Sequence, residues 1–330
     1  MPAPRISVVI PAYNAAVHLD RCLESLEQST LVPLECIVVD DGSSDDTAEV
    51  ATRRRVRLVR LATQRGPAYA RNRGVGCAAG EIIVFLDADV TVQRGTVERI
   101  ARAFEQDANL DALMGSYDDE PAEPSFLSQY RNLLHCYTHQ RAREQASTFW
   151  CGCGAIRRDV YLAHGGLDES YTRPSIEDIE LGYRLYRAGR RIQIDPTIQV
   201  KHHKRWTLGG MLRTDMFSRG IPWTRLILRD RRMPDELSLE WGQRTSVALA
   251  GLLVLIVLGL FAWRKFHLVL AFVGVIGVIL FLNRRFYQFL ALRRGWSFAA
   301  RAIPAHVGYL LYSGLAFAAG AVTYVFARKP

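Results

Sequence analysis

The chain has 330 residues, a formal net charge of +9 and a hydrophobic fraction of 49%. This length accommodates one large domain or two ordinary ones. The positive charge comes almost entirely from arginine, and no nucleic-acid-binding motif accompanies it. We therefore expect phosphorylated substrates or an anionic membrane surface as partners, and no nucleic acid. The first residues lead directly into an apolar run without a signal peptide, so the N-terminal part is expected in the cytoplasm.

The six cysteines are scattered, and several of them lie inside apolar runs. Such cysteines are typical of small buried hydrophobic side chains. Cys151 and Cys153 are close together, but a C-x-C pair alone does not have the spacing of a zinc site.

In about the first ninety residues, short apolar runs alternate with segments whose apolar residues recur at helical spacing. Strands are expected at 6–10, 35–39, 56–61 and 81–86, and helices at 16–28, 48–54 and 67–79. The first strand is expected to end at Pro11, and Asp46-Thr47 to begin the second helix. This alternation predicts an α/β domain with a parallel, doubly wound sheet.

The pattern becomes less regular further on. One helix and a short strand are expected within 91–117, a helix over 126–145, and a helix over 175–188 that is closed by Gly189. Short strands are expected at 191–194 and 198–200. The segment 150–155 is rich in small residues, which suits a backbone that a ligand approaches closely.

Residues 207–244 combine an apolar stripe at helical spacing with many arginines, interrupted at Gly220-Ile221-Pro222. This combination is typical of amphipathic helices that lie in a membrane interface. We expect them to separate an N-terminal domain (1–206) from a membrane domain (245–330).

Three transmembrane helices are predicted, over 245–263, 266–282 and 303–327. The loop between the second and third holds five arginines, whereas the loop between the first and second holds only Arg264 and Lys265. The positive-inside rule places the arginine-rich loop and the N-terminal domain in the cytoplasm. The expected location is therefore the inner (cytoplasmic) membrane, with several spans and the C-terminus outside.

Aspartates follow two of the predicted strands. Asp40 and Asp41 end the second, while Asp87 and Asp89 follow the buried run 82–86. Parallel sheets bind ligands at this end of their strands, and carboxylates on alternate residues suit Mg²⁺ or Mn²⁺. A merely solvated strand end is the alternative.

Together these segments resemble the family two nucleotide-sugar glycosyltransferases of the GT-A fold, which has a Rossmann-like, mostly parallel sheet. The resemblance covers residues 6 to about 204. The matching stretches, in order, are Val8-Val9-Ile10-Pro11-Ala12-Tyr13-Asn14, Val38-Val39-Asp40-Asp41-Gly42-Ser43, Ala70-Arg71-Asn72-Arg73-Gly74, Phe85-Leu86-Asp87-Ala88-Asp89, Gly165-Gly166-Leu167-Asp168-Glu169, Glu177-Asp178-Ile179-Glu180-Leu181 and Val200-Lys201-His202.

The resemblance implies a role for each matching residue. Pro11 and Asp41 would line the nucleobase pocket of a UDP- or GDP-sugar, Arg71 would hold the nucleotide, and Asp87 would contact the ribose side. Asp89 would bind a divalent cation, with His202 reaching the metal or the diphosphate. Asp178 would be the catalytic base. Glu177, Trp150 and Trp206 would support the site or the acceptor.

These residues also have ordinary alternatives. Glu177 and Glu180 could be first-turn acids that favour the helix dipole, Glu180 and Arg184 an ordinary helical ion pair, and Asp168-Glu169 a structural turn. One of the adjacent histidines His202 and His203 is expected to be only a solvated side chain.

The chain departs from the family pattern at several places. Gln64 stands where the family often has asparagine. In the loop that would correspond to the family's acceptor loop, residues 150–154, Cys151 and Cys153 stand where glycines or small polar residues are usual. The Gln-x-x-Arg-Trp motif of processive synthases is absent, and three spans are too few for a polymer channel.

We therefore expect an inverting, metal-dependent transferase that glycosylates a lipid-linked or membrane-presented hydroxyl or glycan acceptor among membrane lipids. A polyprenyl-phosphate sugar synthase is the alternative enzyme, and a non-catalytic nucleotide-sugar-binding membrane protein is the alternative of another class.

Overall fold

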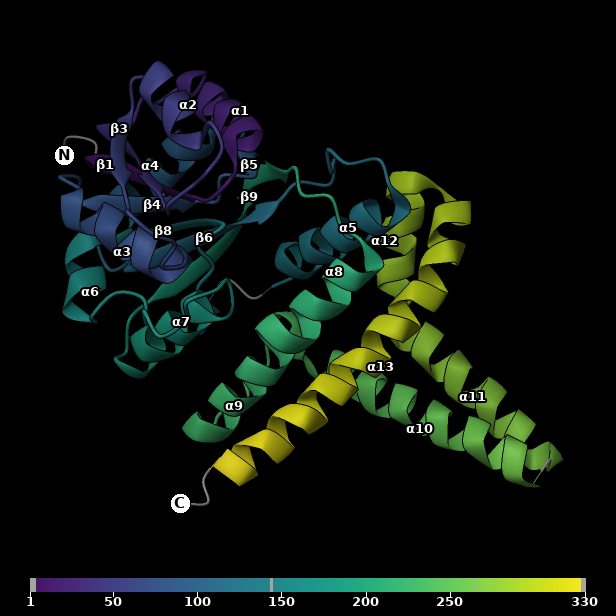
Figure 1. Ribbon diagram of the computed structural model, residues 1–330. Coiled ribbons are helices and arrows are strands. Elements are labelled where there is room, and N and C mark those ends of the chain that lie inside the picture. The colour runs from purple at the N-terminus through teal and green to yellow at the C-terminus, as the bar shows by residue number, and fades with distance from the viewer. Residues whose placement is uncertain (1–3, 143–144, 264, 328–330) are drawn as a thin grey trace. The chain divides into compact units, whose positions relative to one another are not determined.

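The computed structural model describes residues 4–142, 145–263 and 265–327 (Figure 1). The chain divides into two compact units, residues 1–206 and 207–330.

One mixed sheet forms the centre of unit 1, and in the described residues it has nine strands. Eight of them lie in the order β3 (Arg57–Arg60), β2 (Glu35–Asp40), β1 (Ile6–Ala12), β4 (Ile82–Leu86), β8 (Cys153–Arg157), β6 (Ala112–Tyr117), β9 (Ile192–His202) and β5 (Val90–Val92). The ninth, β7 (Gln145–Ala146), pairs with β9.

The expected parallel, doubly wound arrangement is confirmed for β1 to β4. Helices α1 (Ala16–Glu27) and α2 (Thr47–Arg53) pack together on one side of these strands, and α3 (Pro67–Cys77) packs on β1 and β2 from the other (Figure 1). The remaining helices of unit 1 are α4 (Thr96–Gln106), α5 (Phe126–Gln140), α6 (Arg158–Ala163) and α7 (Glu177–Arg187).

The prediction of a mostly parallel sheet is wrong for the second half. Of the eight pairings among the described residues, four are parallel and four antiparallel. Two of the antiparallel pairings arise because β8 enters between β4 and β6 in the opposite direction, and the other two join β5 and β7 to β9. The sequence of β8, Cys-Gly-Ala-Ile-Arg, hides this strand, since small residues have low strand propensity.

Three local predictions need correction. Pro11 lies inside β1, whose pairing with β4 stops at Val9 while its pairing with β2 continues to Ala12, so no neighbour on the β4 side needs the missing N–H. The two short strands expected at 191–194 and 198–200 are one strand, β9. The side chain of Asp46 does not cap α2; Asp45 Oδ1 instead accepts from the Thr47 N–H at 3.1 Å.

The helix expected over 126–145 ends earlier, at Gln140, whereas the predicted end of α7 is confirmed. Gly189 has a φ of +72°, and the N–H of Arg190 donates to the Leu185 carbonyl at 3.0 Å. This pair of features is a Schellman ending, which a glycine allows at low cost.

Unit 2 is helical. It contains α8 (Leu208–Arg213), a π-helical segment (Thr214–Gly220), α9 (Ile221–Asp230), a short 3₁₀ turn (Leu237–Leu239), α10 (Trp241–Trp263), α11 (Phe266–Leu282), α12 (Arg284–Arg294) and α13 (Trp296–Ala327).

The expected interruption at Gly220 to Pro222 is absent, because the π-helical segment runs directly into α9. Gly220 and Gly320 allow close packing of this continuous helix on α13. A Cβ on Gly220 would lie 2.7 Å from the Cβ of Ala316, and one on Gly320 would lie 2.6 Å from the Cβ of Thr224. Small residues permit this approach of two helices, so α9 packs on α13.

Two described helices, α10 and α13, are long and apolar enough to cross a membrane. Helix α11 is a third candidate if it forms one span with α12, to which it is joined at a 64° bend. The described helices therefore offer two or three spans, and the predicted number of three stays a prediction.

The packing of α7 gives a testable consequence. A Cβ on Gly182 would lie 2.3 Å from the backbone nitrogen of Phe149, whereas one on Gly76 in α3 meets nothing within 4 Å. We expect Gly182→Ala to destabilise unit 1 by about 1–3 kcal/mol through overpacking. Gly76→Ala is the matched control and should stabilise by up to about 1 kcal/mol. Chemical unfolding of the full chain in detergent measures both, and equal effects would contradict this account of α7.

Candidate active site

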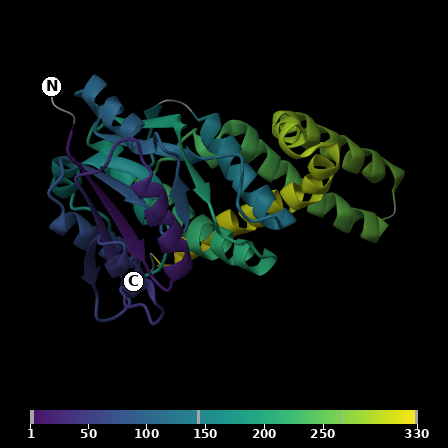
Figure 2. The same cartoon turned by 90° about the horizontal axis from the view of Figure 1, so that it is seen from above.

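The predicted site residues lie where strands of unit 1 end and two helices begin. Pro11 is the second-last residue of β1, Asp41 directly follows β2, and Asp87 directly follows β4. Arg71 lies on α3, and Glu177 and Asp178 form the first residues of α7. Figure 2 gives a second view of the sheet that carries them.

Asp41 is buried and holds the loop that enters α3. Its Oδ1 accepts from the Arg65 N–H at 2.7 Å and its Oδ2 from the Gly66 N–H at 2.8 Å. Gly66 has a φ of +97°, and a Cβ there would lie 2.5 Å from the Thr172 carbonyl oxygen. Asp41 thus shapes the loop between β3 and α3, in addition to any contact with a ligand.

Arg71 joins two predicted site residues that lie far apart in sequence. Its guanidinium is buried and donates through one nitrogen to Asp87 Oδ1 at 2.7 Å and through another to Glu177 Oε1 at 3.1 Å. Burial by itself lowers the pKa of Arg71, but the surrounding acidic groups more than offset this, and the net shift of the pKa is upward. Arg71 therefore stays charged and ties the end of β4 to the start of α7.

Asp89 and His202 form a second pair. His202 Nε2 lies 3.4 Å from Asp89 Oδ2, and its Nδ1 lies 2.7 Å from the side-chain oxygen of Asn132. Burial raises the pKa of Asp89, but the hydrogen bond and charge of His202, together with Lys204, lower it to about 2. The carboxylate is therefore ionised throughout the physiological pH range.

This pair fits a divalent cation in its chemistry. One carboxylate oxygen and one imidazole nitrogen, close enough to share an ion, form a mixed donor set that Mn²⁺ accepts. Across the described residues, no group of three His, Cys, Asp or Glu side chains could hold a metal. A cation at Asp89 and His202 would therefore need further oxygen ligands from a bound molecule.

Asp178 is fixed between α7 and the segment rich in small residues. Its Oδ2 accepts from the Cys151 N–H at 3.1 Å, and its Oδ1 from the Ile179 N–H at 2.8 Å. The side chain is half-buried. The predicted acceptor segment and the predicted base are thus in direct contact.

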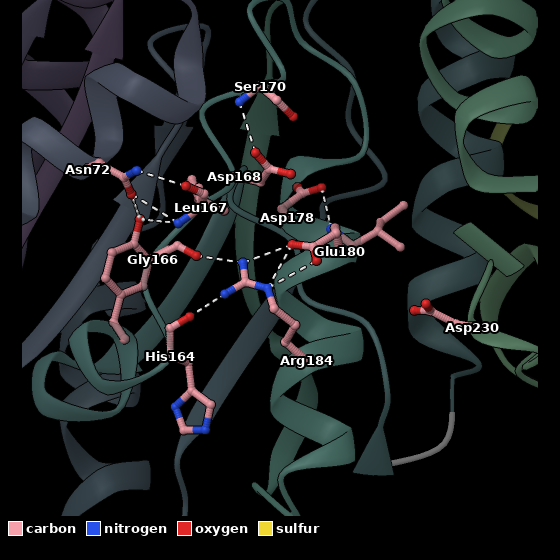
Figure 3. A network of polar contacts seen from close by, with 12 residues as sticks. Asn72, His164, Gly166, Leu167, Asp168, Ser170, Asp178, Glu180, Arg184 and Asp230 are labelled. Atoms are coloured by element: carbon pink, nitrogen blue, oxygen red, sulfur yellow. Dashed lines mark hydrogen bonds and ion pairs between the residues drawn. The ribbon is translucent and has the colours of Figure 1, made fainter. Parts of the chain in front are cut away.

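A polar network fixes the rest of α7 (Figure 3). Arg184 forms an ion pair with Glu180 at 2.8 Å and also donates to the carbonyls of His164 and Gly166. The pair is therefore more than an ordinary surface contact, because it fastens α7 to the turn at Gly165-Gly166. Asp168 belongs to that turn and accepts from the Ser170 N–H at 2.9 Å, in agreement with the structural alternative.

A row of aromatic and histidine rings leads away from His202. Tyr117 stacks on His202 with 4.4 Å between ring centroids and meets Trp150 edge-on at 4.9 Å. His139 also packs against Trp150, at 5.0 Å. Trp206 is separate from these contacts and has the Lys204 ammonium 4.4 Å from its ring.

The sequence analysis missed Tyr117, Asn132, His139 and Asp118. The four-residue spacing of His135 and His139 indicates that both lie on one face of a helix. It does not indicate where in the fold this helix, α5, packs. Burial raises the pKa of Asp118 to about 6, while Lys201 opposes this rise. Asp118 lies directly after β6, and its Oδ2 is 3.8 Å from the Lys201 ammonium.

The cysteines behave as predicted. All six are free, and Cys22, Cys136, Cys151 and Cys153 are buried. Burial raises the pKa of Cys153 to about 12, so this thiol stays protonated. Cys151 and Cys153 therefore act as small apolar side chains, Cys151 next to Asp178 and Cys153 beside the end of β4.

The family described as "Glycosyl transferase family 2" has a model that matches residues 7–165. Validoxylamine A glucosyltransferase of Streptomyces hygroscopicus subsp. jinggangensis is 29% identical over 259 residues, which cover 66% of this chain and 61% of that protein. Pre-mycofactocin glycosyltransferase of Mycobacterium tuberculosis is 32% identical over 231 residues, covering 62% of this chain and 43% of that protein. The chain thus spans less than two thirds of the length of these relatives.

Two solved structures share the fold. Mannosyltransferase PcManGT from Pyrobaculum calidifontis, in complex with GDP-Man and Mn²⁺, has a TM-score of 0.61 at 17% identity, and the match covers 99% of this chain and 88% of that one. S. aureus TarS 1-349 in complex with UDP-GlcNAc has a TM-score of 0.54 at 19% identity, covering 95% and 90%.

Proposed function

The chain belongs to glycosyl transferase family 2 through residues 7–165, and from this premise we propose that it transfers a sugar from a nucleotide diphosphate to a membrane-presented hydroxyl group. The observation that carries the proposal is the Arg71 bridge between Asp87 and Glu177. It brings the acidic strand end and the start of α7 to one place, as a donor and an acceptor that react together require.

The donor would bind at the strand ends. PcManGT and TarS bind GDP-Man and UDP-GlcNAc, which supports a UDP- or GDP-sugar here. Pro11 and Asp41 would line the base pocket, and Asp87 would face the ribose. Because Arg71 already donates to two carboxylates, its proposed role is to hold Asp87 in position and to balance the charge of this acidic site.

Asp89 and His202 would hold the divalent cation, Mg²⁺ or Mn²⁺. PcManGT contains Mn²⁺, and the imidazole ligand favours Mn²⁺ over Mg²⁺. When bound, the cation neutralises charge that develops on the departing diphosphate. Trp150, Trp206 and Glu177 would support the acceptor side.

Asp178 would be the general base. A hydroxyl is a weak nucleophile, so a carboxylate must take its proton as it attacks. The bond from the Cys151 N–H holds Asp178 Oδ2 in place. In-line attack on the anomeric carbon, with the diphosphate leaving on the opposite side, would invert the configuration.

Metal removal tests the donor site. With a UDP- or GDP-sugar, an acceptor lipid extract and Mn²⁺, the purified full chain should release nucleotide, and EDTA should abolish the release. Asp89→Ala should remove turnover without preventing folding, and the unfolding temperature should fall because the contact between Asp89 and His202 is lost. Nucleotide release that continues in EDTA would contradict the proposed metal dependence. Donor binding without nucleotide release would favour a non-catalytic nucleotide-sugar-binding protein.

Replacing the base tests the acceptor class. Asp178→Asn keeps the shape, but its single acceptor oxygen can keep only one of the two bonds from the Cys151 and Ile179 N–H groups, and it cannot accept a proton at neutral pH. We expect transfer to fall about a hundred- to ten-thousand-fold with donor affinity retained.

Donor affinity by calorimetry and transfer rate are compared in the same preparations. Near-normal transfer by Asp178→Asn would remove Asp178 as base and favour an ionised polyprenyl-phosphate acceptor. A loss of donor affinity would instead make Asp178 a donor-site residue.

The acceptor is proposed to be lipid-linked or otherwise held at the membrane, because α10 and α13 are apolar enough to span it. The chain would reside in the inner membrane with unit 1 in the cytoplasm. With three spans, a reporter fused after Pro330 should lie outside the cytoplasm and one at Met1 inside. Both reporters on the same side would indicate two spans and would remove α11 as a crossing segment.

A further inference from the structure

The ring of His202 is held on three sides. Its Nδ1 lies 2.7 Å from Asn132 Oδ1, and its face stacks on Tyr117 at an interplanar angle of 9°. Its Nε2 lies 3.4 Å from Asp89 Oδ2. Both His202 and Asn132 are buried, with 5% and 2% exposure.

We propose that Asn132 is a positioning residue for the divalent cation, acting through His202. An amide oxygen can only accept a hydrogen bond, so His202 Nδ1 must carry the hydrogen. When the ring carries only this one hydrogen, the lone pair is on Nε2, which faces Asp89. A cation shared with Asp89 would stand where a hydrogen on Nε2 otherwise bonds to that carboxylate. The inference rests on the proposed metal-dependent function.

The surroundings make this tautomer and orientation costly to change. If Nε2 carried the hydrogen of the neutral ring, the Nδ1 lone pair would face the oxygen of Asn132 in a buried site. Turning the ring would break its stacking on Tyr117. Asn132 therefore sets the direction of the metal ligand before any ion binds.

The other half of the Asn132 amide strengthens the inference. Its Nδ2 is buried and has no hydrogen-bond partner in the described part of the chain. A half-satisfied buried amide reduces stability, and a leucine of similar size would avoid that cost. Packing alone therefore does not account for asparagine here, whereas the bond to His202 does.

The helix that carries Asn132 is held independently of His202. Ser128 Oγ accepts from the Trp206 N–H at 2.8 Å, and Gln129 Nε2 donates to the carbonyls of Pro121 and Glu123 at 3.0 and 2.6 Å. Gln129 is therefore a matched control, since it is a buried amide of the same helix that bonds to a loop.

The test measures Mn²⁺ binding by the full chain in detergent, with saturating UDP or GDP, from the EPR signal of free Mn²⁺. We expect Asn132→Leu to weaken Mn²⁺ binding by about 10- to 100-fold, the usual effect of losing such a support. Asn132→Asp keeps an acceptor oxygen and should bind Mn²⁺ at least as tightly as the wild type. Gln129→Leu should leave Mn²⁺ binding unchanged.

A pulsed-EPR measurement adds a signature that a general loss of stability does not mimic. The wild type and Asn132→Asp should show modulation from a coordinated imidazole nitrogen, which Asn132→Leu should lose or weaken. If Asn132→Leu does not fold, Asn132→Ala replaces it in both measurements.

Wild-type Mn²⁺ affinity in Asn132→Leu would overturn the proposal, as would an equal loss in Gln129→Leu or failure of Asn132→Asp to retain binding. These outcomes leave the metal site itself intact. Absence of Mn²⁺ binding by the wild type would instead overturn the metal dependence in the proposed function, and the positioning role with it.

Discussion

The buried charge of Arg71 is the constraint on which the candidate site depends. A guanidinium removed from water is costly unless acidic partners and hydrogen bonds compensate it. Asp87 supplies one partner from the end of β4, and Glu177 supplies the other from the start of α7. Because neither carboxylate alone would compensate the charge as well, the strand end and the helix start are held together, and the proposed donor and acceptor sides of the site form one structure.

Helix α7 is also held along its length by contacts that do not involve Arg71. At its start, Asp178 accepts from the backbone of Cys151, and one turn later Gly182 lets the helix lie directly on the backbone of Phe149. Further along, Arg184 fastens it to the glycine turn (Figure 3). A proposed general base on such a support is positioned without a cost at the moment of reaction.

The proposed metal ligands are organised by a different device. His202 ends β9, and its direction is set by Asn132 on α5 and by the ring of Tyr117 at the end of β6. Three elements therefore fix one imidazole, while Asp89 comes from the loop after β4. The ion would complete its coordination with oxygens of the sugar donor, and this would link cation binding to nucleotide binding.

The sequence by itself determined the alternating strands and helices up to Asp87, the acidic strand ends and the apolar helices of unit 2. These features depend on local periodicity and on side chains that stop a strand or helix. Only the tertiary structure decided that β8 runs antiparallel and that α5 delivers Asn132 to His202 and His139 to Trp150. It also decided that Arg71 bonds to Glu177. Such pairings join residues far apart in the chain, and no local pattern distinguishes them from ordinary helix faces or small-residue loops.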